Sequence, residues 1–307
     1  MINGIINVNK EKGYTSHDVV AKLRGILKQK KIGHTGTLDP DAEGVLPVCL
    51  GNATKLCDLL TDKDKTYEAV LLLGITTDTQ DITGSVLETN EVTAGRKLIE
   101  EVILSFIGEY DQLPPMYSAI KVGGKRLYEL ARAGKEVERE TRKVRIHNIR
   151  ILEFNEEKHE IRMSVDCSKG TYIRTLCHDI GAILKCGGCM KSLLRTKAGA
   201  FILENSLKLS DIQGILQQDR LMDYLIKADD MFPDFTKITV AEEYTKFIYN
   251  GNSFRTNQMK ERTDVSGNSI VNDITGQVRV YDSQNQFIGI YEYRSEDKVF
   301  KPVKMFL

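Results

Sequence analysis

Residues 144–184, VRIHNIRILEFNEEKHEIRMSVDCSKGTYIRTLCHDIGAIL, contain two hydrophobic periodicities that decide the fold class. Segments 144–154 and 160–167 are typical of two strands joined by the polar stretch NEEKH. The second strand alternates, and its apolar face consists of Ile161, Met163, Val165 and Cys167. Helical spacing then begins near residue 171, and the positions expected to face inward are Ile173, Leu176, Cys177, Ile180 and Ile183. The stretch predicts an antiparallel strand pair followed by a helix.

The N-terminal half shows the same mixture of strands and helices. GIINVNK at 4–10 is expected to be a strand, and Ser16 is expected to cap a helix over 16–29. The continuous apolar run in 66–74 predicts a largely buried strand. Thr93 is expected to begin a further helix, with inward positions Leu98, Ile99, Val102, Ile103, Phe106 and Ile107. Hairpin-like pairs are as frequent as strand–helix–strand units, which indicates an α+β fold with a mixed, mainly antiparallel sheet and flanking helices.

The pattern breaks at ADDMFPDFTK, residues 228–237. Short strand-like pieces follow, among them QVRVYD, FIGIYEY and FKPVKMFL, joined by polar segments. We therefore expect one domain over 1–230 and a small β-rich domain over 231–307.

Bulk composition is that of an ordinary globular protein, with 43 basic and 43 acidic residues in 307. The first eight residues are too short and insufficiently basic for a signal peptide. No apolar run approaches the ~18 residues typical of a membrane span. The expected location is the cytoplasm, without membrane contact.

Six cysteines include a CxxC motif, Cys186-Gly-Gly-Cys189. A zinc site would require a second cysteine or histidine pair at matching spacing, and only His178 is near. A redox CxxC opens a helix after a strand, whereas this motif follows a helical run. Reduced thiols are the favoured interpretation, and no metal site is expected.

Local charge is uneven despite the neutral total. Residues 121–150 contain ten basic and four acidic side chains, a net charge of +6. Gly123, Gly124, Tyr117 and Tyr128 lie within or beside this run, and mobile glycines, aromatic rings and cations together suit an insertion that clamps a phosphate backbone. The alternative is a solvated helix face over RLYELARAGKEVERE.

The loop HTGTLDPDAEGVL, residues 34–46, holds a single aspartate, Asp39, before a proline. Asp39 is therefore biased toward extended or turn geometry, and a simple capped turn is the alternative to an active site. Arg174 is expected in the first turn of a helix, where the helix dipole disfavours a cation. A carboxylate partner would compensate it, and Asp39 is the candidate; Asp179 is a poorly spaced alternative.

Four motifs resemble the TruB family, the tRNA pseudouridine synthases that act on the T-loop uridine at position 55. They are GHTGTLDPDAEGVLPV (33–48), KTYEAVLLLG (65–74), PPMYSAIKVGGKRLYELARAG (114–134) and SKGTYIRTLCHDIG (168–181). They occur in the family's order, and the similarity extends over about the first 230 residues. The resemblance implies a pseudouridine synthase fold, with a basic RNA-clamping insertion over 114–146 and a PUA-like C-terminal domain.

The resemblance also assigns roles to individual residues. Asp39 matches the catalytic aspartate, Arg174 the arginine paired with it, and Tyr67 the tyrosine that stacks under the target uracil and assists proton removal. The other matches are His34 for the residue filling the space of the flipped base, and Tyr172 and Leu193 for pocket residues. The basic run is expected to supply the contacts to the RNA backbone, through Lys121, Lys125, Arg126 and Arg132. Family members often carry two arginines where this chain has Leu194-Arg195. Lys10 lies in a turn where Glu11 replaces the family's proline, and we expect it to be structural.

Such an isomerisation needs neither a redox change nor a group donor, so no cofactor is expected. The expected partner is the T-stem-loop of tRNA, bound by a monomer without an obligate protein partner. The alternatives are an RNA-binding or tRNA-folding module and a pseudouridine synthase that acts on another RNA. A serine hydrolase is disfavoured because the chain has no G-x-S-x-G motif.

Overall fold

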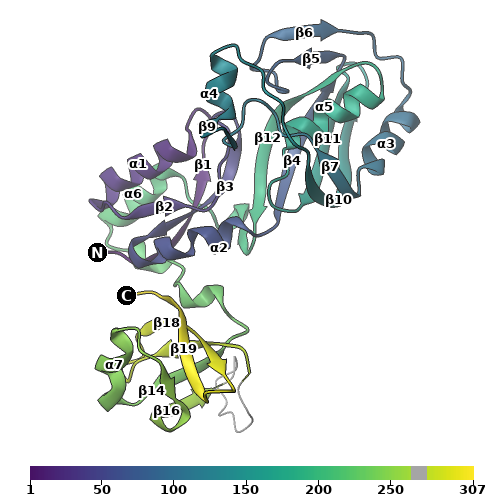
Figure 1. Ribbon diagram of the computed structural model, residues 1–307. Helices are drawn as coiled ribbons and strands as arrows, with labels where there is room; N and C mark the ends of the chain where they lie inside the picture. Colours follow the sequence, from purple (N-terminus) through teal and green to yellow (C-terminus); the bar gives the residue numbers. More distant parts are fainter. Residues whose placement is uncertain (264–274) are drawn as a thin grey trace.

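The computed structural model describes residues 1–263 and 275–307. Figure 1 shows a larger body built on one long sheet and a smaller body below it, which contains the C-terminus. The strands of the large sheet lie between Gly4 and Ile202, and those of the small sheet between Thr236 and Met305.

The large sheet has nine strands, and its order explains how segments far apart in sequence meet. The main path is β1 (Gly4–Lys10), β3 (Glu43–Leu50), β12 (Gly188–Ala198), β4 (Lys65–Leu73), β11 (Glu160–Cys167), β10 (Arg142–Asn155) and β7 (Gly108–Gln112). In addition, β2 (Ile32–His34) pairs with β3, and β13 (Phe201–Ile202) pairs with β12. Only β12 and β3 are parallel; the other pairings of this sheet are antiparallel. The expected mixed, mainly antiparallel sheet is confirmed, and so is the strand pair expected over 144–154 and 160–167.

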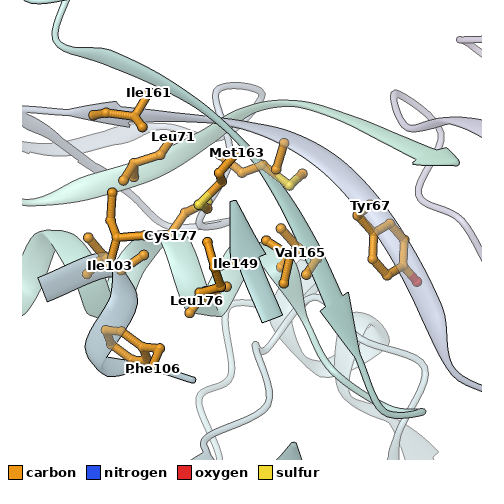
Figure 2. Packing of buried hydrophobic residues seen from close by; sticks show 14 of the residues in the cluster. Tyr67, Leu71, Ile103, Phe106, Ile149, Ile161, Met163, Val165, Leu176 and Cys177 are labelled. Atoms are coloured by element: carbon orange, nitrogen blue, oxygen red, sulfur yellow. The ribbon is translucent and has the colours of Figure 1, made fainter. Parts of the chain in front are cut away.

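Helices cover the sheet in two groups (Figure 1). One group is α1 (Ser16–Leu27) with α6 (Leu209–Gln217), beside β1 and β2. The other is α3 (Arg96–Ser105) with α5 (Ile173–Ile183), toward the end of the sheet formed by β11, β10 and β7. Figure 2 shows side chains of the second group and of β4, β10 and β11 packed in one core. Helix α5 approaches β12 closely, because a Cβ on Gly181 would lie 2.2 Å from the backbone nitrogen of Gly188.

Several local predictions were wrong. Leu98 and Ile183 are exposed rather than buried, because α3 and α5 present these positions to solvent. Ile107 is exposed as well, and it lies beyond the end of α3 rather than in the helix. Strand β4 alternates between buried and half-buried residues instead of being uniformly buried. The N-cap of α1 is Thr15 and not Ser16: the Thr15 hydroxyl accepts a hydrogen bond from the Asp18 amide, and the Asp18 carboxylate accepts one from the Thr15 amide.

The basic segment is mostly not helical. It contains the short hairpin of β8 (Lys121–Val122) and β9 (Lys125–Arg126), followed by the six-residue helix α4 (Leu127–Arg132). The alternative of a long helix over RLYELARAGKEVERE is therefore wrong beyond residue 132. The remaining short elements of the large body are α2 (Cys57–Thr61) and the hairpin of β5 (Ile75–Thr77) and β6 (Val86–Thr89).

The C-terminal body is β-rich, as expected. Its sheet has the order β15 (Phe254–Arg255), β19 (Val299–Met305), β18 (Phe287–Arg294), β17 (Gln277–Tyr281), β14 (Thr236–Val240) and β16 (Met259–Thr263), with α7 (Thr245–Tyr249) beside it. The two bodies share an apolar cluster in which Ile290 and Phe306 pack with Ile5 and Val45. No helix in the described parts of the chain is long and apolar enough to cross a membrane.

Candidate active site

The loop between β2 and β3 carries Asp39, and three contacts from the N-terminal segment hold it. The Ser16 hydroxyl accepts a hydrogen bond from the Leu38 amide at 2.9 Å. The Lys10 ammonium donates to the Pro40 carbonyl at 3.0 Å, and the Gly13 amide donates to the same carbonyl at 2.9 Å. Lys10 is fully buried, and burial lowers its pKa to about 8. These contacts fix the backbone on both sides of Asp39, in agreement with a structural role for Lys10.

Asp39 and Arg174 form the ion pair that the sequence predicted. The Arg174 Nε atom lies 3.0 Å from Asp39 Oδ2, and Nη2 lies 3.3 Å from Oδ1, so both carboxylate oxygens are engaged. Arg174 enters from the first turn of α5, and its side chain is only 6% exposed. The alternative partner Asp179 instead accepts a hydrogen bond from the Tyr110 hydroxyl.

Arg174 is itself held by three groups from other segments. It donates hydrogen bonds to the carbonyls of Tyr117 at 2.9 Å and Thr79 at 3.1 Å. The Asp81 carboxylate lies 3.7 Å from its Nη1. Because the guanidinium is fixed on several sides, it presents a rigid fork to Asp39.

The electrostatics of Asp39 are balanced between burial and this cation. Burial raises the pKa of the Asp39 carboxyl, and the Arg174 guanidinium opposes the rise. The Asp39 side chain is nevertheless 39% exposed, so a substrate can reach it. An accessible carboxylate in a bidentate pair is suited to act as a nucleophile or base.

Tyr67 lies at one end of the hydrophobic core, and its hydroxyl points away from the packed side chains (Figure 2). Leu193 and Leu38 belong to the same cluster, so the core brings β4, β12 and the Asp39 loop together. Burial raises the pKa of the Tyr67 hydroxyl, and the neighbouring Arg195 guanidinium opposes this effect.

His34 and Tyr172 flank this centre without direct polar contact to Asp39. The His34 Nδ1 atom lies 2.9 Å from the Gly36 carbonyl, and its ring meets that of His17 edge-on at 5.3 Å between centroids. Tyr172 precedes α5 and exchanges backbone hydrogen bonds with the Gln112 side chain.

The four predicted backbone-binding residues lie on the β8–β9 hairpin and α4, away from the core. Lys121, Lys125 and Arg126 are exposed. The guanidinium groups of Arg126 and Arg132 lie over the Tyr128 ring, at 5.8 and 5.5 Å from its centroid. Tyr117, whose carbonyl binds Arg174, precedes this hairpin and links it to the site.

Sequence reasoning missed Asp81, Ser16 and Arg195 as parts of this site. Asp81 lies in the turn DTQDITG, which resembles any polar turn, and the sequence around Ser16 predicts only a helix cap. In the segment KSLLRT the sequence comparison noted Arg195 but assigned a role only to Leu193.

All six cysteines are free, and Cys186 and Cys189 are buried. Within residues 1–263 and 275–307, no group of three or more histidine, cysteine or acidic side chains is arranged to hold a metal ion.

Comparison with known proteins shows the family to which this chain belongs. Residues 24–173 match the N-terminal domain model of the TruB family of pseudouridylate synthases, and residues 174–231 match a tRNA pseudouridylate synthase B C-terminal domain model. The chain belongs to the TruB family.

Individual relatives give the degree of similarity. A tRNA pseudouridine synthase B of Lachnoclostridium phytofermentans is 57% identical, with all of both chains covered. One of Alkaliphilus oremlandii is 46% identical over 99% of this chain and 97% of its own. Among solved structures, a Cbf5–Nop10–Gar1 complex contains a chain with a TM-score of 0.69 and 25% identity, covering 99% of this chain and 85% of that one.

Proposed function

We propose that this protein isomerises the T-loop uridine at position 55 of tRNA to pseudouridine. The observation that carries the proposal is the accessible Asp39 carboxylate, held by the buried Arg174 beside Tyr67 in a chain of the TruB family. The named relatives at 57% and 46% identity are tRNA pseudouridine synthases B along their whole length, which supports tRNA as the substrate.

The reaction breaks the C–N glycosidic bond and joins C5 of the same uracil to C1′. Asp39 would act by adding to C1′, by adding to C6 or by abstracting the 2′ hydrogen. The detached uracil must turn before it escapes, so Tyr67 would hold it by stacking while Leu193 and Tyr172 line the pocket. Tyr67 would also assist removal of the C5 proton. No step requires a cofactor.

The target base must first leave the folded T-loop, which costs a few kcal/mol. His34 lies on the strand that leads into the Asp39 loop, and its ring would occupy the space that the base vacates. The hairpin and α4 would hold the RNA backbone through Lys121, Lys125, Arg126 and Arg132.

The direct test is release of tritium from C5-labelled uridine in a T-stem-loop RNA. Asp39→Asn should lose release by several orders of magnitude, because the amide is neither a nucleophile nor a base at neutral pH. Asp41→Asn changes an exposed carboxylate of the same loop and should retain release within about threefold. Equal release from Asp39→Asn and the unsubstituted protein would remove Asp39 as the catalyst.

The same assay separates this proposal from its alternatives. An RNA-binding or tRNA-folding module would bind the T-stem-loop without releasing tritium. A synthase for another RNA would leave the T-loop uridine unchanged while acting on its own substrate.

The basic segment should supply affinity that depends on salt. In the triple variant Lys125→Ala, Arg126→Ala and Arg132→Ala, tRNA binding should weaken and the slope of log K against log salt should fall by about one per lost phosphate contact. A matched triple of exposed lysines on other elements, Lys97, Lys158 and Lys185 to Ala, should change the slope less. Unchanged affinity and slope in the first variant would reject the clamp.

We further propose that residues 1–230 form the catalytic domain and 231–307 a PUA-like domain that contacts the acceptor-stem side of the tRNA without taking part in chemistry. The protein would act as a monomer in the cytoplasm, where tRNA is modified and thiols stay reduced. Analytical ultracentrifugation of the protein with and without tRNA tests the monomer.

A further inference from the structure

Arg195 is among the largest fully buried side chains in residues 1–263 and 275–307, and its environment is unusual for a cation. It is 1% exposed and lies in β12, between β3 and β4. No ion pair joins it to a carboxylate within the described residues, where Nε donates to the Val45 carbonyl at 2.7 Å and Nη1 reaches the Thr37 carbonyl at 3.5 Å. A buried cation without a counterion costs free energy of folding, so the burial of Arg195 points to a role beyond stability.

The guanidinium also has a free donor. Within residues 1–263 and 275–307, no hydrogen-bond partner satisfies Arg195 Nη2, although the atom is buried. An unsatisfied buried donor costs free energy in the unliganded state, and it is available to any acceptor brought within reach.

Strand pairing places this donor beside a residue of the site. Arg195 is the direct cross-strand partner of Tyr67 in the antiparallel β12–β4 ladder, so the two side chains leave the same face of the sheet as neighbours. The register shifts between Arg195 and Lys197, and such an irregularity re-aims the side chains beside it.

A second strand brings Arg195 against the Asp39 loop. Arg195 pairs with Gly44 in the parallel β12–β3 contact. Gly44 has φ of +104°, and a Cβ there would lie 2.2 Å from the Arg195 carbonyl oxygen, so only glycine permits this approach. Arg195 therefore binds β3 at Val45 and the loop at Thr37 through its side chain, and pairs with the strand that carries Tyr67 through its backbone.

We propose that Arg195 is a positioning residue for the isomerisation: when the substrate is bound, its Nη2 donates a hydrogen bond to the Tyr67 hydroxyl and holds the ring in place. Nε and Nη1, bound to the Val45 and Thr37 carbonyls, keep the guanidinium in position for this contact. This inference rests on the proposed function. Arg195 acts through Tyr67, not by touching the substrate.

The test is a double-variant cycle in the full-length protein. Arg195→Gln removes the charge and fork, Arg195→Lys keeps the charge alone, and Lys197→Gln removes an exposed cation from the same strand as a control. Each is made with Tyr67 intact and with Tyr67→Phe. Single-turnover rates on a T-stem-loop RNA are measured with enzyme in excess and over long times, alongside RNA affinity and thermal melting of the same proteins.

With Tyr67 intact, Arg195→Gln should lower the single-turnover rate about tenfold and leave RNA affinity within about twofold, since contacting residues are coupled. In the Tyr67→Phe background the same substitution should lower the rate less than about twofold. Arg195→Lys should recover part of the loss, and Lys197→Gln should change neither quantity.

Equal falls in both backgrounds, or a fall confined to RNA affinity, would overturn the proposal. If Arg195→Gln does not fold, the rate loss in the two Tyr67 backgrounds is compared for Arg195→Lys instead, because lysine also lacks the Nη2 donor. Failure of the proposed function would instead appear as absence of turnover in the unsubstituted protein.

Discussion

The pairing of Asp39 with Arg174 sets the pH at which the carboxylate can act. Burial raises the pKa of Asp39 and Arg174 lowers it, so Arg174→Met should raise that pKa further. Activity that needs ionised Asp39 is lost as pH falls through its pKa, so the acidic limb of the single-turnover pH profile should move to higher pH, by about one unit or more. Arg174→Lys keeps a charge but not the bidentate fork, and should lower the rate with a smaller displacement. A limb that stays at the same pH in Arg174→Met would show that Asp39 does not titrate in it.

The ion pair between Asp39 and Arg174 could be predicted from the sequence for a physical reason. A cation in the first turn of a helix needs compensation, and that requirement can be read from the chain. Nothing in the local sequence marks Asp81 or Arg195 as part of the site in this way. Asp81 comes close to Arg174 only because the turn after β5 folds over α5, and Arg195 is buried only because β12 is inserted between β3 and β4.

At the level of elements, two neighbouring residues at the start of α1 make different contacts. One stabilises the helix, and the other holds the loop that carries Asp39. Thr15 caps the helix, whereas the neighbouring Ser16 accepts a hydrogen bond from the Leu38 amide beside Asp39. Thr15→Ala should lower the free energy of unfolding by about 1 kcal/mol and leave the rate unchanged. Ser16→Ala should lower the single-turnover rate several-fold, because the loop loses an anchor. Urea unfolding and single-turnover assays on both variants measure this, and the reverse assignment of effects would contradict it.

Hydrophobic periodicity predicted which elements exist better than which residues they bury. The alternation of Ile161, Met163, Val165 and Cys167 was confirmed because β11 lies in the middle of the sheet, with its apolar face fully covered. Ile183 and Leu98 were wrongly expected to be buried, because helical spacing shows which residues form an apolar stripe but not how much of that stripe is covered by other elements. The parallel pairing of β12 with β3 could not be predicted, since nothing local links residue 44 to residue 195.

At the level of the whole molecule, the smaller body is attached to the strands that lead to the site. Phe306 stacks with Phe287 at 5.2 Å between ring centroids and belongs to the cluster that contains Ile5 and Val45 of β1 and β3. Lys55 also donates a hydrogen bond to the Leu307 carbonyl at 3.2 Å. The two bodies therefore share buried apolar surface, and we expect them to unfold together.

Phe306→Ala should weaken this attachment. Removing a buried phenylalanine costs about 3 kcal/mol through lost burial and the cavity left behind, so the melting temperature should fall by several degrees. Phe247→Ala truncates a phenylalanine of α7 that is 45% exposed and should change it little. Scanning calorimetry of both variants measures the effect. A second transition in Phe306→Ala would show that the C-terminal body had been uncoupled, whereas a profile identical to that of the unsubstituted protein would mean that the shared cluster does not join the two bodies.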